Sequence, residues 1–302
     1  MNDWFEWNGV RCTNYGIHCA SLPVIQTPSE RVEYTDVPGR NGSLIVTEGD
    51  EVYEDLELSV TCFVENLSNP EEIIKFLRGT GKVTFASRPY GFYYARIINP
   101  MQFAKIVRGS GYRTFTVTFR CEPFFYKMED ALDTLTTTPS TITNHGMSYS
   151  QPRIEVRFQY SGTGTGAITL NVGEQSVSIT PKEIPTFSST STSTYAVGDH
   201  VYRSGVLYEC IVAITTGGAW DASKWSEVTE GYLESGIIID SDMMECFDID
   251  GLSYANQYVS ITEFPILKSG ENEISWSYEA ASGSSQTATV TEVKILKRER
   301  GL

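Results

Sequence analysis

The side chains that could do catalytic chemistry are few and far apart in the sequence. The chain has three histidines, His18, His145 and His200. None of them has a second histidine at helical spacing or a serine nucleophile motif beside it. A histidine-based site is therefore not indicated, and we predict no catalytic residue and no enzyme activity.

Carboxylates gather between Asp240 and Asp250, where hard oxygen ligands could in principle hold a cation such as calcium. The Asp-Ile-Asp-Gly sequence at 248–251 is only a fragment of a calcium-loop pattern, because the other ligand positions and the terminal glutamate are missing. We therefore expect a solvated turn, with no metal and no cofactor. The glycine-rich stretch at 162–166 lacks a following lysine or helix to hold phosphate, so it is interpreted as a flexible hairpin.

Aromatic residues concentrate in one segment, residues 195–225. About thirty residues cannot bury every ring, so at least one ring is expected to face outward. An exposed flat ring suits a sugar, whose C–H bonds pack on the π-surface while nearby polar groups bind the hydroxyls. A Pro-then-Ser/Thr stretch at 181–194 precedes the segment and is typical of a flexible linker.

The aromatic segment resembles the small chitin-binding modules of chitinases and of many phage proteins. The resemblance lies in Tyr-x-x-Gly-Asp-x-Val from Tyr195, Gly-x-x-Tyr-x-Cys from Gly205, and the paired tryptophans Trp220 and Trp225. It implies that Trp220, which precedes an acidic-x-Ser step, is the sugar platform and that Trp225 is mainly structural. The alternative, in which all the rings serve as core, stays open. The candidate carbohydrate-binding residues are Trp220, Tyr202, Tyr195 and Trp225.

Composition limits the partners of this 302-residue chain, whose formal net charge is −15. Such acidity argues against nucleic acid and against an anionic membrane surface as partners. The chain opens without the apolar region of a leader, and no apolar run reaches the length of a membrane span, so we expect a soluble protein made in the cytoplasm. Six cysteines without Cys-x-x-Cys spacing are interpreted as buried thiols.

The first part of the chain is predicted to be mostly β with one helix across it. Asn69 and Pro70 resemble a capped helix start, and glycines at 79 and 81 end the helix. Residues 56–64 alternate apolar and polar, as a strand with one buried face does. A short hairpin over 4–17 and further strands are expected, the strands at 30–36, 43–47, 82–86, 92–98 and 114–122.

The rest of the chain is predicted to hold a second β domain with the aromatic segment inserted in one of its loops. Residues 127–150 have no hydrophobic period and are interpreted as an extended connector. Removing the segment leaves an uninterrupted run of strands, the last of them including 265–267, and surface loops tolerate such insertions. The predicted domains are residues 1–130, a connector at 131–150, a sandwich of 151–182 with 231–302, and an insert at 183–230.

A tight turn at 36–44 marks the first domain, because Pro-Gly and Asn-Gly flank Arg40 between two extended runs. Together with later motifs, it resembles the distal tail protein of long-tailed, siphovirus-type bacteriophages or prophages. The resemblance spans everything outside the insertion. The other motifs are the helix-then-strand run at 73–85, Asn-His-Gly at 144–146 before Gln-Pro-Arg-Ile at 151–154, and Pro-x-Leu-x-x-Gly-x-Asn at 265–272.

The resemblance implies a mainly β fold: an N-terminal β-rich ring domain with one helix, and a C-terminal galectin-like β-sandwich that carries the small all-β module. It also implies a homo-hexamer at the virion tail tip, in contact with the tail tube protein and with tail-tip or receptor-binding proteins. A ring uses a heterologous interface, to which Arg40 is assigned. The chain is thus predicted to be a structural hub whose module binds host cell-wall polysaccharide.

Two alternative functions remain open at the level of sequence. A secreted glycan-binding accessory protein would favour a leader peptide and a paired-carboxylate cleft, and the sequence shows neither clearly. A pure assembly hub with a non-binding insertion would give normal tail assembly together with silence on a glycan array.

Overall fold

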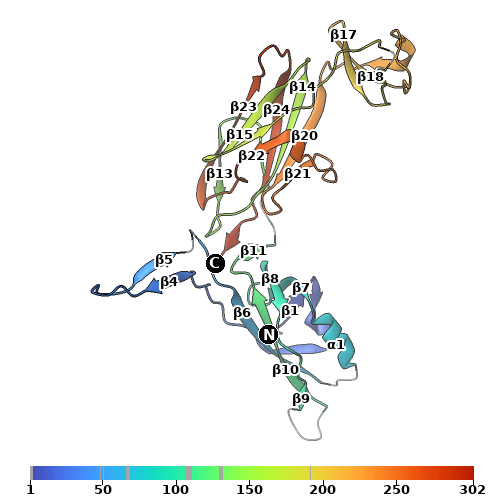
Figure 1. The fold of residues 1–302 in the computed structure, drawn as a ribbon. Helices are drawn as coiled ribbons and strands as arrows, with labels where there is room; N and C mark the ends of the chain where they lie inside the picture. The colour runs from blue at the N-terminus through green and yellow to red at the C-terminus, as the bar shows by residue number, and fades with distance from the viewer. Residues whose placement is uncertain are drawn as a thin grey trace. The chain divides into compact units, whose positions relative to one another are not determined.

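The computed structural model describes residues 3–47, 49, 51–65, 69–105, 111–128, 132–190 and 192–302. Antiparallel strands dominate this part of the chain (Figure 1), so the prediction of a mainly β protein is confirmed. None of the helices within these ranges is long and apolar enough to cross a membrane. The chain divides into two compact units, unit 1 with Met1–Asp130, Gly146–Ser148 and Glu299–Leu302, and unit 2 with Ala131–His145 and Tyr149–Arg298.

Unit 1 is built on a ten-stranded sheet whose main path runs β2-β1-β7-β8-β10-β6-β3. In β6 every second residue is buried, as the apolar alternation of 56–64 predicts. β6 pairs with β10 from Val64 opposite Arg113 to Leu56 opposite Cys121. The strands are β1 (Phe5–Trp7), β2 (Val10–Arg11), β3 (Ile17–Ser21), β6 (Leu56–Val64), β7 (Thr80–Phe85), β8 (Gly91–Ile97), β9 (Ala104–Lys105), β10 (Arg113–Cys121), β11 (Phe125–Lys127) and β25 (Arg300–Gly301).

Aromatic packing and one helix complete the core of unit 1. The ring of Phe119 lies 5.5 Å from that of Phe5 and 5.6 Å from that of Trp7. The helix α1 (Pro70–Phe76) buries Ile73 against this cluster. Pro70 stands in the first turn, where a missing N–H costs no hydrogen bond. The expected cap is not made, because the side chain of Asn69 forms no capping hydrogen bond.

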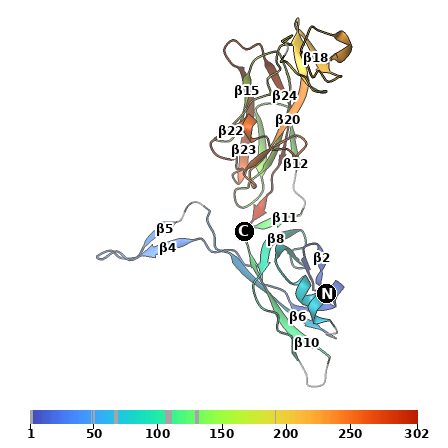
Figure 2. The same cartoon turned by 45° about the vertical axis from the view of Figure 1, so that its right-hand side comes forward.

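A hairpin of unit 1 forms a sheet of its own. β4 (Val32–Thr35) and β5 (Leu44–Thr47) pair as a two-stranded sheet, and both views show it extending away from the rest of the unit (Figure 2). The predicted turn joins them, with Gly39 and Gly42 at φ values of 82° and 79°. At the base of the hairpin the pairing continues beyond the two strands, where the backbone N–H of Arg31 donates to the carbonyl of Val52 at 2.9 Å.

Unit 2 contains a sandwich of two five-stranded sheets, ordered β12-β24-β14-β20-β21 and β13-β23-β15-β16-β22. Ile154 of one sheet and Ile168 of the other are fully buried in a single core, which makes the two sheets one body. The strands are β12 (Leu132–Leu135), β13 (Ser140–Asn144), β14 (Arg153–Ser161), β15 (Gly166–Val172), β16 (Gln175–Ile179), β20 (Leu233–Asp240), β21 (Glu245–Asp248), β22 (Val259–Ile261), β23 (Gly270–Ala280) and β24 (Thr287–Leu296).

Two expectations for the second half of the chain are wrong in detail. The segment expected as an extended connector contains β12 and β13, because a strand that buries only Ile142 and Asn144 shows no hydrophobic period. The expected strand at 265–267 is only an isolated bridge between Leu267 and Ser150. Leu267 is nevertheless fully buried. The apolar residue that suggested a strand therefore packs in the core of the sandwich.

The carboxylates of 240–250 are not all solvated, contrary to the expectation of a solvated turn. Asp240 is 2% exposed, and its two oxygens accept hydrogen bonds from Arg298 at 2.6 and 2.8 Å. Burial alone would raise the pKa of Asp240, but the hydrogen bonds and charge of Arg298 outweigh it and hold that pKa below the usual range. Asp250 fits the expectation better, because it is exposed and accepts the backbone N–H groups of Leu252 and Ser253.

Replacing Asp240 with asparagine should destabilise unit 2 by about 2 kcal/mol, because it removes the two short charged hydrogen bonds of Arg298 and leaves its guanidinium the longer contact with Asp242, at 3.8 Å. Since the folded pKa of Asp240 is lowered, its contribution is present above the unfolded carboxyl pKa and is lost as the pH falls towards the folded value. Urea unfolding of both proteins at neutral and acidic pH measures this. The difference between them should shrink in acid; a difference that stays constant would contradict the assignment.

Candidate functional site

The inserted segment folds as a three-stranded antiparallel sheet, β17 (His200–Arg203), β18 (Val206–Cys210) and β19 (Trp225–Glu227). Ser204 and Gly205 join the first two strands, and both have positive φ, 53° and 82°. Two such residues in a two-residue loop match the twist of a hairpin. Val201, Cys210 and Trp225 form the small buried core of this sheet.

The acidic-x-Ser step of the sequence is a structural cap. The carboxylate of Asp221 accepts hydrogen bonds from the backbone N–H of Ser223 at 3.1 Å and from its hydroxyl at 2.7 Å. These bonds hold the pKa of Asp221 below its usual range. They begin the short 3-10 helix η2 (Ala222–Lys224), which fixes the path of the chain between Trp220 and Trp225.

The rings of the segment form one cluster, with Trp220 at its more accessible side. Trp220 and Trp225 are stacked, with ring centroids 5.1 Å apart and planes at 12°. Tyr208 lies 4.8 Å from Trp220, and the guanidinium carbon of Arg203 lies 4.5 Å from the centre of the same ring. Trp225 is 5% exposed, whereas Trp220 is only half-buried. Trp220 is therefore the tryptophan that a ligand could reach, backed by a rigid partner ring.

The structure brings Tyr195 into the same cluster but not Tyr202. The ring of Tyr195 lies 5.1 Å from that of Trp225, and its hydroxyl accepts a hydrogen bond from the backbone N–H of Ser188 at 2.9 Å. The hydroxyl of Tyr202 instead accepts from the backbone N–H of Gly162, a sandwich residue, at 2.6 Å. Its ring packs against the sandwich core, so Tyr202 joins the module to the sandwich rather than lying with the other candidate rings.

Part of the expected flexible linker belongs to the ring cluster. Phe187 stacks on Tyr195 at 5.7 Å and meets Trp220 edge-on at 5.0 Å. Ile184 is 2% exposed in the sandwich core. The linker therefore packs through its two large apolar residues, Ile184 on the sandwich and Phe187 on the ring cluster. Sequence reasoning missed Phe187 and Arg203; an isolated phenylalanine in a Ser/Thr-rich run was the available signal.

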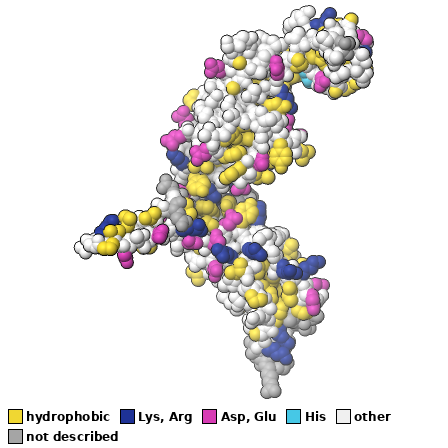
Figure 3. All heavy atoms as spheres, in the orientation of Figure 1, with side chains coloured by type: hydrophobic (Ala, Val, Ile, Leu, Met, Phe, Trp, Pro, Cys, Tyr) yellow, Lys and Arg dark blue, Asp and Glu magenta, His cyan; other side chains and the backbone are white. Residues whose placement is uncertain are grey.

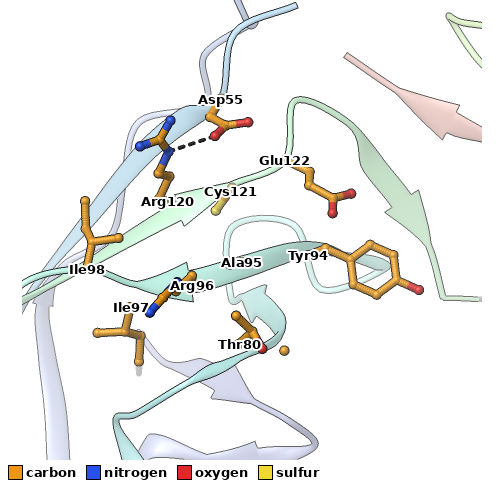
Figure 4. A pocket seen from close by; sticks show the side chains of 11 residues that line it. Asp55, Thr80, Tyr94, Ala95, Arg96, Ile97, Ile98, Arg120, Cys121 and Glu122 are labelled. Carbon is orange, nitrogen blue, oxygen red and sulfur yellow. Dashed lines mark hydrogen bonds and ion pairs between the residues drawn. The ribbon is translucent and has the colours of Figure 1, made fainter.

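Unit 1 has a hollow of its own, of about 730 Å³, lined by residues of β8 and β10 (Figure 4). The ion pair between Arg120 and Asp55, at 2.7 Å, lies at one side. Cys121 also lines it, and burial raises the pKa of that thiol to about 12. The thiol is therefore protonated at neutral pH and is not an activated nucleophile.

Arg40, the residue assigned to a ring interface, lies at the exposed tip of the β4–β5 hairpin. Its backbone N–H donates to the carbonyl of Val37 at 3.1 Å, which closes the turn. The structure thus places Arg40 in unit 1 and the ring cluster in unit 2.

Comparison with solved structures identifies the fold. A crystal structure of the Dit protein of phage SPP1 matches with a TM-score of 0.59 and 14% sequence identity, and the match covers 100% of both chains. The chain has the fold of a Dit protein. The SPP1 protein is described as a paradigm of the hub adsorption apparatus in phages that infect Gram-positive bacteria. No protein-family model and no curated protein matches the sequence.

The likeness to the Dit fold covers both the hairpin that carries Arg40 and the segment that carries Trp220. At 14% identity the likeness concerns the arrangement of the backbone and not individual side chains. It therefore supports the family resemblance carried by the motifs around Arg40. The roles of Arg40 and Trp220 rest on their own geometry.

Proposed function

We propose that the chain is a hub of a siphovirus-type phage tail tip. In this role it assembles as a hexameric ring, contacts the tail tube protein and tail-tip or receptor-binding proteins, and binds host cell-wall polysaccharide through the inserted module. The observation that carries the hub role is the match of the whole chain to the SPP1 Dit fold. A galectin-like sandwich as the carrier of the module is part of the same proposal.

The exposed hairpin of unit 1 supports assembly with other copies. Tyr34 and Ile45 lie opposite each other on one face and are 66% and 58% exposed. Leu44 and Val46 on the other strand face are 40% and 45% exposed. Figure 3 shows apolar side chains along this hairpin. Contiguous exposed apolar surface marks an interaction site, and a ring joins one patch of each subunit to a different patch of the next.

Replacing Arg40 with glutamate should weaken ring assembly, because it reverses the charge at the hairpin tip. A like-charge contact repeated at every interface of a ring costs several kcal/mol, so the ring population should fall about tenfold or more at a fixed protein concentration. Mass photometry measures that population. Lys268→Glu, at an exposed position of the sandwich, is the matched control. Equal ring populations for Arg40→Glu and for the unmodified protein would contradict the assignment.

The half-buried Trp220 supports glycan binding by the module. The ring of Trp220 is held by its stacked neighbour Trp225, and the guanidinium of Arg203 lies over the same ring. A sugar face that packs on Trp220 would displace this guanidinium, which can then donate hydrogen bonds to sugar hydroxyls or carboxylates. Several modules on one ring would add avidity to a weak single site.

A pure assembly hub is the second candidate. It is favoured by the extent to which Phe187, Tyr208 and Trp225 pack on Trp220 as a core of the segment. A glycan array separates the two: binding by the intact protein supports the adhesive hub, and silence with normal tail assembly supports the pure hub.

A further inference from the structure

A cleft of about 680 Å³ lies in unit 2 where the inserted module meets the sandwich. Strands β14, β20 and β21 supply one wall, and the linker with the start of the module supplies the other. Its volume is in the range of small-molecule sites. Tyr195 reaches it, but Trp220 does not line it, so the cleft is distinct from the accessible side of the ring cluster.

Contacts within the protein hold the linker wall of this cleft in place. The amine of Lys182 lies 3.4 Å from the carboxylate of Asp248, and Ile184 is buried in the sandwich core. The hydroxyl of Tyr202 accepts the hydrogen bond of Gly162. These contacts form without a ligand, so the cleft is preorganised. Binding therefore loses little conformational entropy in ordering the linker.

Tyr160, at the end of β14, gives the cleft an unused polar group. The residue lines the cleft and is only 6% exposed. Among the described residues none forms a hydrogen bond with its hydroxyl. Burial raises the pKa of Tyr160, which keeps it a neutral phenol that can donate. The hydroxyl oxygen is not one of the fully buried polar atoms without a partner, so it stays accessible from the cleft, and a ligand oxygen that reaches it takes the place of water.

The rim of the cleft is acidic. Glu183, Asp199 and Glu234 line it and are exposed, and half-buried His200 lines it too. One carboxylate oxygen of Asp199 accepts the backbone N–H of Ala196, and one of Glu234 accepts the amide N–H of Gln159, so each keeps a second oxygen for a ligand. The charge of Lys182 is matched by Asp248, so the rim keeps an excess of negative charge. Half-buried Leu233 and Ile249 and the buried Ile184 supply an apolar floor. Negative charge around an apolar floor is complementary to a ligand with a cationic group and C–H faces.

We propose that this cleft binds a saccharide with a free protonated amine, of the glucosamine type. Sugar C–H groups lie on the apolar floor, a sugar hydroxyl pairs with the phenol of Tyr160, and the ammonium group lies among the rim carboxylates. The inference rests on the proposed glycan-binding function and adds to it a second site with a defined charge preference.

Calorimetric titration of the full chain with a glucosamine trimer tests the proposal. We expect Tyr160→Phe to weaken binding roughly threefold to tenfold, because it removes one hydroxyl and nothing else. Glu183→Gln combined with Glu234→Gln should weaken binding about tenfold. It should also make binding less dependent on salt, because the attraction between the ammonium group and these carboxylates, which salt screens, is then absent. The trimer of N-acetylglucosamine, which lacks the charge, should bind the unmodified protein more weakly than the amine does.

Matched controls lie outside the cleft. Tyr254→Phe and Glu174→Gln change an exposed tyrosine and an exposed glutamate of the sandwich and should leave the affinity unchanged. Failure of the unmodified protein to bind the glucosamine trimer, or equal affinity for Tyr160→Phe, overturns the proposal. Trp220→Ala separates the two sites: it should spare binding of the free trimer in the cleft. If cells are still bound in a Trp220-dependent way while the cleft variants have no effect, only the cleft proposal fails.

Discussion

Replacing Trp220 with alanine should remove most of the binding of the fluorescently tagged protein to host cells. An aromatic contact contributes about 1 kcal/mol, so the loss of a sugar-stacking ring should lower the affinity of one module about tenfold. Because several modules of one ring engage at once, the losses multiply, and we expect decoration to fall by about a hundredfold or more. Fluorescence microscopy or flow cytometry over a range of protein concentrations gives the measurement.

Two variants make the Trp220 result specific. Trp220→Phe keeps a flat ring beside Trp225 and should retain part of the binding. Tyr254→Ala removes a 63% exposed ring of the sandwich and should have no effect. Circular dichroism must show that Trp220→Ala is folded, since the ring also contacts Tyr208 and Phe187. Undiminished decoration by a folded Trp220→Ala protein would show that the ring is not the sugar platform.

Replacing Ile45 with lysine should convert rings into single chains. The side chain is 58% exposed in the single subunit, so the fold should lose no more than about 0.5 kcal/mol of stability. In a ring the substitution removes an apolar contact worth about 1.5–3 kcal/mol and buries a charge at every interface. We therefore expect the subunit dissociation constant to rise by a factor of about a hundred or more. Mass photometry and negative-stain microscopy measure the ring population.

Leu252→Lys is the matched control for the hairpin experiment, because Leu252 is 85% exposed on the sandwich of unit 2. It changes charge and apolar area as Ile45→Lys does, but outside the hairpin. If both variants form as many rings as the unmodified protein, the hairpin is not the assembly element. Reduced rings for both would point to a general effect of the added charge, which also contradicts a specific role of Ile45.

The variants Ile45→Lys and Trp220→Ala together distinguish ring assembly from glycan binding. Ile45 lies in unit 1 and Trp220 in unit 2. A protein that carries Ile45→Lys should keep its single-module affinity for glycan but lose avidity, whereas Trp220→Ala should form normal rings that do not bind. Such a pattern would show that host binding depends on the module and that its strength depends on the ring.

Local patterns in the sequence determined much of the fold. The alternation of 56–64 predicted β6 with its bounds, and the Asn-Pro start with glycines beyond it predicted α1 to within a few residues. The Pro-Gly and Asn-Gly pairs around Arg40 predicted a turn that two positive-φ glycines make. Each of these features depends on residues a few positions apart, and short-range sterics and burial act over that distance.

Only the tertiary structure decided which of the candidate residues meet. Asp240 and Arg298 are 58 residues apart in sequence, and nothing local shows that one buries its charge against the other. Tyr202 has the same residue type as Tyr195, yet its hydroxyl meets Gly162 of the sandwich, 40 residues away. The motif marked Trp220 and Trp225 as a pair, but their unequal exposure follows from the packing of Phe187, Tyr195 and Tyr208 around them. Contacts between distant residues depend on how the sheets close on one another, and a pattern within one strand does not encode that closure.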